Sequence, residues 1–235
     1  MTNILALDAA TDTCSVALQA HGRVIHRCEL IPRQHNQRLF SMLREVLANA
    51  SPTDRGVELL AYNHGPGSFT GLRIAASAVQ GLAYSCNLPV VGVSTLACLA
   101  QGVWRKGLAD PAAKILVILD ARINQVYWGL YACEAGTAVS LLADTVSEPG
   151  AIPGNLVAEG EPLIAVGSGL CYLEQLAPGL RTAITHVLPE QWPDSLDTLS
   201  LAELDRQRGK LLAAEQVQPV YLRNEIQWKK ISEQG

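Results

Sequence analysis

The chain has 235 residues, enough for one or two domains, and its charged fraction of 17 % lies below the typical ~25 %. Its net charge of −4 excludes the strongly basic surface of a protein that binds nucleic acid unaided, and no apolar run is long enough to span a bilayer. Its cysteines form no C-x-x-C pair and follow no secretory signal core, so we expect reduced thiols in a cytoplasmic protein.

The first hundred residues predict a strand meander followed by alternating helices and strands. An apolar run closed by Asp8 is typical of a buried strand, and two further strands around a turn at 21–23 complete the meander. The predicted strands cover 4–8, 15–20, 24–30, 59–63 and 88–93. Apolar residues at helical spacing predict helices over 36–50, about 70–86 and 94–103.

The pattern restarts at Ile115-Leu-Val-Ile-Leu-Asp120-Ala121, which repeats Ile4-Leu-Ala-Leu-Asp8-Ala9. Such a repeat predicts two related lobes, residues 1–104 and 105–235, with the last helix and tail able to pack back on the first lobe. An echo this short also arises by chance. The later elements that we expect are strands at 126–133, 139–146 and 163–166, a helix after the turn at 167–169, a helix over 198–214, and an extended segment at 219–223.

A glycine-rich stretch, Gly65-Pro-Gly67-Ser68-Phe69-Thr70-Gly71-Leu72-Arg73, links a predicted strand to a helix. Its glycines and two capping hydroxyls would let backbone N–H groups bind an anion, and a tight, well-capped turn explains the same residues. It is no P-loop, because no Lys follows the last Gly. Arg73 opposes the helix dipole, so we expect it to contact an acid in this chain or in a partner.

This stretch and several others resemble the bacterial TsaB (YeaZ) family from end to end. The other matching stretches are Asp8-Ala-Ala-Thr11, Gly81-Leu-Ala83, Pro89-Val-Val-Gly-Val-Ser-Thr-Leu96, Asp120-Ala-Arg122 and Tyr221-Leu-Arg223. The resemblance implies an α/β fold of two lobes, actin-like and sugar-kinase-like (ASKHA). It also implies a role in placing threonylcarbamoyl on N6 of the adenosine beside the anticodon, in tRNAs that read codons beginning with adenine.

In the family that this chain resembles, the catalytic subunit is the related protein TsaD, TsaE is an ATP-binding partner, and TsaB is non-catalytic. TsaD carries a stretch of the form Pro-x-Ile-Gly-Val-Asn-His-Met-Glu-Gly-His-Leu, whose two histidines hold a metal. Thr95 and Leu99 occupy those two positions here, and neither replaces imidazole at a transition-metal site. We therefore expect no catalytic residue, metal or cofactor in this chain, with ATP and a metal ion used by the partner subunits and tRNA contacted through the complex.

Two turns resemble degenerate nucleotide-binding loops. Actin-like kinases use Asp-x-Gly-Thr after the first strand, whereas this chain has Asp8-Ala-Ala-Thr11, and the turn after Asp120 carries a long Arg side chain. Gly167-Ser-Gly169 resembles the turn that receives adenosine in such folds, and is equally an ordinary strand-to-helix turn. We interpret Asp8 and Asp120 as structural residues. The remnant set is Asp8, Thr11, Gly65, Gly67, Ser68, Thr70, Asp120, Gly167 and Gly169.

The helix predicted from about residue 70 to 86 is small or apolar nearly all round, unlike a surface helix. One stripe can face the chain's own sheet, and a second stripe of small residues would admit a partner helix; burial of both stripes within the chain is the alternative. The family resemblance favours the partner helix, because in that family the first two long helices form the contact with TsaD. The same surface, left uncovered, is apolar enough that we expect the isolated chain to form a homodimer through it. The predicted interface is Phe40, Met42, Arg73, Ile74, Ser77, Ala78, Gly81 and Ser85.

The histidines show no clustering in the sequence. His35 and His64 deserve notice for their places beside the first helix and the glycine-rich stretch, although a structural or surface role suits both. A stand-alone enzyme, kinase-like or of the peptidase type, remains the alternative function. A peptidase requires a nucleophile–base pair or a metal site, and the sequence reveals neither.

Overall fold

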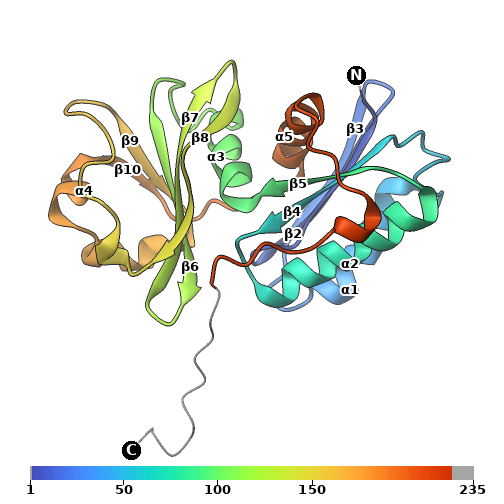
Figure 1. Cartoon of the computed structure of the whole chain (residues 1–235), viewed down its shortest axis with the longest axis horizontal. Coiled ribbons are helices and arrows are strands. Elements are labelled where there is room, and N and C mark those ends of the chain that lie inside the picture. Colours follow the sequence, from blue (N-terminus) through green and yellow to red (C-terminus); the bar gives the residue numbers. More distant parts are fainter. Residues whose placement is uncertain (1, 224–235) are drawn as a thin grey trace, which may run out of the picture.

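The computed structural model describes residues 2–223 and arranges them in two lobes, each built on a mixed five-stranded sheet (Figure 1). The first sheet has the order β3-β2-β1-β4-β5 and the second β10-β9-β6-β7-β8. The first contains β1 (Ile4–Asp8), β2 (Thr13–Ala20), β3 (Arg23–Leu30), β4 (Leu59–Gly65) and β5 (Val90–Ser94). The second contains β6 (Lys114–Arg122), β7 (Gln125–Glu134), β8 (Thr137–Ser147), β9 (Leu163–Val166) and β10 (Ile184–Leu188).

The two sheets repeat one topology. β1 pairs antiparallel with β2 and parallel with β4, and β6 pairs antiparallel with β7 and parallel with β9. The outer pairs match too: β2 with β3 and β7 with β8 are antiparallel, while β4 with β5 and β9 with β10 are parallel. The duplicated α/β unit predicted from the echo between Ile4–Asp8 and the strand before Asp120 is therefore confirmed.

Helices cover both faces of the first sheet (Figure 1). α1 (His35–Leu47) and α2 (Phe69–Cys86) pack on one face, and α3 (Thr95–Arg105) and α5 (Ser195–Gln207) lie between the two sheets. The remaining short helices are η1 (Pro149–Ala151), η2 (Ser168–Gln175), α4 (Pro178–Ala183) and η3 (Ala214–Gln216). Within residues 2–223 we find no helix with the length and hydropathy that crossing a bilayer requires.

The last helix lies earlier in the chain than predicted. The expected span 198–214 becomes Ser195–Gln207, because the Asp194 side chain accepts the Leu196 N–H at 2.9 Å and so caps the helix start. Gly209, with φ +75°, ends it in the left-handed conformation that commonly terminates helices. The sequence also missed α4 and β10. β10 is an edge strand with exposed residues at its centre, so it lacks the apolar run by which the other strands were recognised.

One hydrophobic cluster joins the lobes. It contains residues of the first sheet such as Ala61, residues of the second such as Val117, and buried residues of both α3 and α5. α5 follows the second sheet in sequence but packs on β1, β2, β4 and β5 of the first. The two lobes therefore share buried apolar side chains around these two helices.

Candidate functional site

The outer surface of α1 and α2 carries most of the predicted interface. Phe40 is 49 % exposed, and Arg73, Ser77, Gly81 and Ser85 are exposed on α2. A shallow groove between the two helices is lined by Asn36, Phe40, Phe69, Thr70, Arg73, Ile74 and Ser77. Exposed aromatic side chains next to small residues at helical spacing form a surface that suits a packed protein partner.

Two residues of the predicted interface are buried. Met42 is fully buried, so its assignment to the surface was wrong: it lies three residues after Leu39 and one before Leu43, and all three face the first sheet's core. Ala78 is 7 % exposed and packs in the same cluster beside Val79, so it lies beneath the surface. The apolar faces of both helices are wider than the sequence stripes suggested.

Arg73 contacts aromatic rings, where we expected an acid. Its guanidinium lies 3.7 Å from the centre of the Phe69 ring, and its Nε donates to Tyr221 Oη at 2.9 Å. The Phe69 and Tyr221 rings are 5.3 Å apart. Within residues 2–223 no carboxylate forms an ion pair with Arg73, so the contact with an acid is not observed in the described part of the chain. The cation instead lies on a π-surface that attracts it.

The glycine-rich stretch packs directly on the turn after Asp8. A Cβ on Gly71 would lie 1.9 Å from the Ala9 carbonyl oxygen, and one on Gly67 would lie 2.2 Å from that of Ala10. The Ser68 N–H donates to the Ala10 carbonyl at 2.7 Å, and Ser68 Oγ accepts the Gly71 N–H at 3.3 Å. The glycines are needed for this close backbone approach, which supports the interpretation as a tight, capped turn.

Two other remnant residues around this turn, Gly65 and Thr11, also contact other parts of the chain. A Cβ on Gly65, whose φ is +128°, would lie 2.5 Å from the Val220 carbonyl oxygen. Thr11 Oγ1 lies 3.0 Å from Thr13 Oγ1, and Thr70 is exposed in the first turn of α2. These contacts join the turn after β1, the start of α2 and the segment near Val220.

Asp8 is fully buried at the end of β1. Its Oδ1 accepts the Ala10 N–H at 3.0 Å, while its Oδ2 has no hydrogen-bond partner in the described structure. Burial raises the pKa of Asp8 to about 7, although the bond from Ala10 favours the charged form. The folded chain therefore holds a proton on Asp8 at pH values where the unfolded chain has lost it.

This raised pKa predicts a pH dependence of stability. The folded-state pKa of Asp8 lies above the unfolded value of 3.8. The contribution of Asp8 to stability is therefore fully present below about pH 4 and is lost as the pH rises through 7. Asp8→Asn keeps the acceptor for Ala10 and cannot ionise. We expect its free energy of unfolding to gain on that of the wild type by about 2–4 kcal/mol between pH 4 and pH 8, measured by urea denaturation. Asp12→Asn, at an exposed position, is the control. If the difference in unfolding free energy between Asp8→Asn and the wild type stays constant with pH, Asp8 titrates normally.

The second remnant turn is closed in the same way. Asp120 accepts the Arg122 N–H at 2.8 Å and pairs with Arg122 Nη1 at 3.1 Å, and the Asp120 N–H donates to Ser168 Oγ at 3.2 Å. A Cβ on Gly167 or on Gly169 would lie 2.5 Å from atoms of Ile118. The Asp120 turn and the Gly167–Gly169 turn are thus brought together, and each glycine is explained by packing against β6.

The two histidines singled out in the sequence have different surroundings. His35 is buried, with Nε2 3.1 Å from the Thr13 carbonyl oxygen, which fits a structural role. His64 lies at the end of β4, where its carbonyl accepts the Val220 N–H at 2.7 Å and Gly92 packs against its ring. Burial lowers the pKa of His64 to about 4, so its imidazole is neutral at pH 7.

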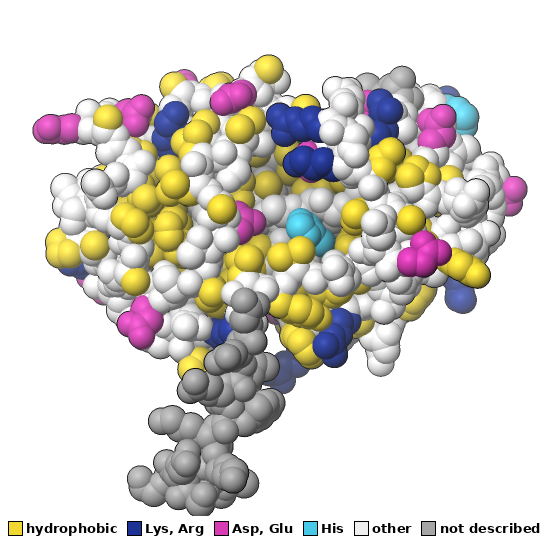
Figure 2. All heavy atoms as spheres, in the orientation of Figure 1, with side chains coloured by type: hydrophobic (Ala, Val, Ile, Leu, Met, Phe, Trp, Pro, Cys, Tyr) yellow, Lys and Arg dark blue, Asp and Glu magenta, His cyan; other side chains and the backbone are white. Residues whose placement is uncertain are grey.

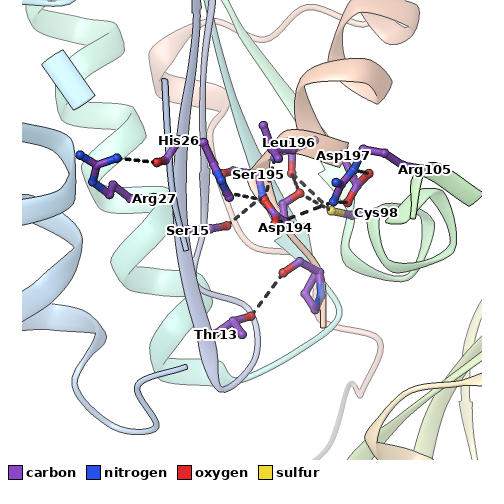
Figure 3. Close-up of polar contacts among 12 residues, drawn as sticks. Thr13, Ser15, His26, Arg27, Cys98, Arg105, Asp194, Ser195, Leu196 and Asp197 are labelled. Atoms are coloured by element: carbon purple, nitrogen blue, oxygen red, sulfur yellow. Dashed lines mark hydrogen bonds and ion pairs between the residues drawn. The ribbon is translucent and has the colours of Figure 1, made fainter. Parts of the chain in front are cut away.

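Sequence reasoning missed a cluster formed by His26, Cys28 and Asp194. His26 and Cys28 are two residues apart on β3 and share one face of the strand. Asp194 precedes α5, and its side chain approaches His26 (Figure 3). His26 Nε2 lies 2.7 Å from Asp194 Oδ1. Although part of Cys28 reaches solvent, desolvation of its thiol and the nearby Asp194 and Asp8 raise the pKa of Cys28 to about 12. The spacing of His26 and Cys28 was a visible signal; the approach of Asp194 was not.

Known proteins resemble this chain over nearly its whole length. A family model described as "TsaD: tRNA N6-adenosine threonylcarbamoyltransferase" matches residues 27–188. The tRNA threonylcarbamoyladenosine biosynthesis protein TsaB of Escherichia coli K12 is 38 % identical over 232 residues, covering 97 % of each chain. TsaB of Haemophilus influenzae is 33 % identical, covering 97 % of this chain and 96 % of its own.

A solved structure shows the same relationship. YeaZ from Pseudomonas aeruginosa is 37 % identical and aligns with a TM-score of 0.86, covering 94 % of this chain and 100 % of its own. The two TsaB sequences and the YeaZ structure each match this chain over nearly its full length, so they indicate the same family. The chain belongs to the TsaB (YeaZ) family.

Proposed function

We propose that this chain acts in tRNA threonylcarbamoyladenosine biosynthesis as a non-catalytic scaffold and activating subunit. In this proposal it binds a TsaD-like catalytic subunit and, with it, a TsaE-like ATPase in the cytoplasm. The complex transfers threonylcarbamoyl to N6 of the adenosine beside the anticodon, while ATP and the metal ion of the reaction are used by the partner subunits. When alone, the chain forms a homodimer through the outer face of α1 and α2, the surface that also binds the TsaD-like subunit.

The observation that carries the proposal is the outer face of α1 and α2. A Cβ on Gly81 would meet nothing within 4 Å, so this part of α2 has room for a helix from another chain to approach. Phe40 and Phe69 are about half exposed on the same side, and Tyr84 is 77 % exposed one turn further along α2. Aromatic anchors beside small residues are the composition that protein interfaces favour.

The two remnant turns support a non-catalytic role. The turn after Asp8 is covered by Gly67 and Gly71 of the glycine-rich stretch, and the Asp120 side chain is engaged by Arg122. A phosphate would have to displace these intramolecular contacts. The structure therefore supports the interpretation of both acids as structural residues.

Contact with tRNA is assigned to the complex, because the basic side chains near α5 are paired. Figure 2 shows Lys and Arg side chains gathered over α5. Arg206 pairs with Glu203 at 2.8 Å, and Lys210 pairs with Asp205 at 2.8 Å. Nearby carboxylates reduce the local excess of positive charge that phosphate binding requires.

Reconstitution tests the proposal. Threonylcarbamoyl transfer to tRNA by TsaD-like and TsaE-like proteins should require this chain in stoichiometric amount, because its role is to complete the complex. Product is measured as modified adenosine in the tRNA, with the partners alone and this chain alone as controls. Full activity of the partners without this chain would contradict the proposed role.

A stand-alone enzyme is the second candidate, favoured by one observation. His26, Cys28 and Asp194 combine a thiol, an imidazole and a carboxylate, the groups of a cysteine hydrolase. Such enzymes lower the pKa of their cysteine, whereas the pKa of Cys28 is raised to about 12, so its thiol is protonated at neutral pH. The test is an assay of this chain without partners. Peptide hydrolysis that Cys28→Ser abolishes would establish the alternative, and so would ATP turnover that Asp8→Ala abolishes.

A further inference from the structure

The cluster of His26, Cys28 and Asp194 brings three different ligand groups to one place. Their donor atoms, a ring nitrogen, a thiol sulfur and a carboxylate oxygen, all lie within 4.8 Å of one another. His26 and Cys28 come from the edge strand β3, and Asp194 comes from the residue before α5. The three groups are thus supplied by segments about 170 residues apart and meet at the edge of the first sheet. Figure 3 shows the approach of Asp194 to His26.

Several contacts hold Asp194 in this position (Figure 3). The Ser195 N–H donates to Ser15 Oγ at 2.8 Å, and Thr13 Oγ1 donates to the Pro193 carbonyl at 3.3 Å, so the segment on both sides of Asp194 is fixed to β2. Because β2 also pairs with β3, the backbone at Asp194 is held in a defined position relative to the backbone of His26 and Cys28.

His26 points into the cluster. Its Nε2 atom lies 2.7 Å from Asp194 Oδ1, an ion-pair contact, while its side chain is 25 % exposed. An imidazole nitrogen that faces a carboxylate oxygen beside a thiol is placed as a metal ligand would be, and a bound ion would take the place of the contact between His26 and Asp194.

We propose that His26, Cys28 and Asp194 bind a divalent transition-metal ion of the zinc class. Nitrogen, sulfur and oxygen ligands together suit zinc, and tetrahedral coordination at its usual bond lengths places ligand atoms about 3.3–3.8 Å apart. In this proposal the three side chains rotate to reach this spacing, and water is the fourth ligand. Cys28 is exposed, so the ion reaches the site from solvent, and the thiol proton leaves to solvent as the Cys28–metal bond forms.

The surrounding charges are compatible with the ion. Arg105 is the nearest cation to Asp194, at 3.8 Å from Oδ2, but both of its closer bonds go to Asp197. Lys106 is a second nearby cation, and its Nζ donates to Gln191. The thiolate and carboxylate ligands balance the two charges of the ion. The bound metal would tie the edge strand β3 to the start of α5, a structural role separate from the proposed function in the tRNA-modifying complex.

Titration with Co²⁺ tests the site, since Co²⁺ takes the coordination of Zn²⁺ and gives a thiolate charge-transfer absorption band. We expect the full chain, stripped of metal with a chelator, to bind one equivalent of Co²⁺ with this band, and Zn²⁺ to displace it. In Cys28→Ser the band should be lost. In His26→Gln and Asp194→Asn the affinity for Co²⁺ should fall more than about 100-fold, beyond the roughly 10–100-fold effect of altering groups that only support a ligand. Asn at position 194 still caps α5, so folding is preserved.

Controls make the outcome decisive. Cys171→Ser removes another exposed thiol outside the cluster and should leave Co²⁺ binding unchanged. The melting temperature should rise with Zn²⁺ in the wild type and in Cys171→Ser, and stay constant in Cys28→Ser. Absence of stoichiometric Co²⁺ binding, or a charge-transfer band that persists in Cys28→Ser, would overturn the proposal.

Discussion

Replacing Arg105 by alanine should lower the free energy of unfolding by about 3 kcal/mol at pH 7, at the low end of the effect of breaking a buried ion pair because Arg105 is 34 % exposed. Its Nε and Nη2 donate to the two carboxylate oxygens of Asp197 at 2.7 and 2.9 Å, and Asp197 is fully buried (Figure 3). Without Arg105 the Asp197 carboxylate is left buried and uncompensated between α3 and α5.

The pH dependence and a double mutant identify this cause. Burial already raises the pKa of Asp197 despite the opposing contact with Arg105. Once Arg105 is removed, Asp197 should take up a proton more readily, so the stability loss should be smaller at pH 5 than at pH 7. Arg105→Ala combined with Asp197→Asn should recover part of the loss, because no buried charge remains. Urea denaturation of each variant measures these effects.

Arg206→Ala is the matched control, because it breaks a partly exposed ion pair with Glu203, one turn away on α5. Ion pairs at the protein surface contribute about 0–1 kcal/mol, so this variant should change the free energy of unfolding little. Equal losses for Arg105→Ala and Arg206→Ala would mean that the pair between α3 and α5 contributes no more than a surface contact.

The backbone plan of this chain was largely predictable because its signals are local. Runs of apolar residues closed by Asp8 and Asp120 marked the first strand of each lobe, and their echo predicted the duplicated topology. The capped turn at Ser68 likewise marked the start of α2 within one residue. Such features depend on neighbours in sequence, so periodicity and cap residues reveal them.

Side-chain environments were harder to predict because they depend on distant segments. Arg73 lies against Tyr221, 148 residues away, where an acid was expected. Met42 was assigned to the surface, yet it is buried. The sheet beneath α1 sets how wide the buried face of the helix is, and the spacing of apolar residues in the sequence does not give that width. The approach of Asp194 to His26 requires the long return of the chain from the second lobe to the first. In each case tertiary packing determines the contact.

Gly81→Leu should weaken binding to the TsaD-like partner by about 10–100-fold while preserving the fold. A bulky side chain forced into a close helix–helix contact costs about 1–3 kcal/mol, which corresponds to one to two decades in the binding constant. Within this chain a Cβ at position 81 meets nothing within 4 Å, and leucine favours the helix over glycine by up to about 1 kcal/mol. Self-association through the same face should weaken in parallel, since an isologous dimer places this surface against its own copy.

The measurements are partner affinity by calorimetry, self-association by sedimentation, and melting temperature under monomeric conditions. Gly81→Ala is the matched control: it gains most of the helix propensity of Gly81→Leu but adds a single carbon, so it should retain most of the binding. Reduced association by Gly81→Leu with the melting temperature kept or raised is the result that supports a partner face on α2. A collapsed melting temperature with both associations unchanged would mean that the Gly81 position is part of the protein's own core, and that partner binding takes place on another surface.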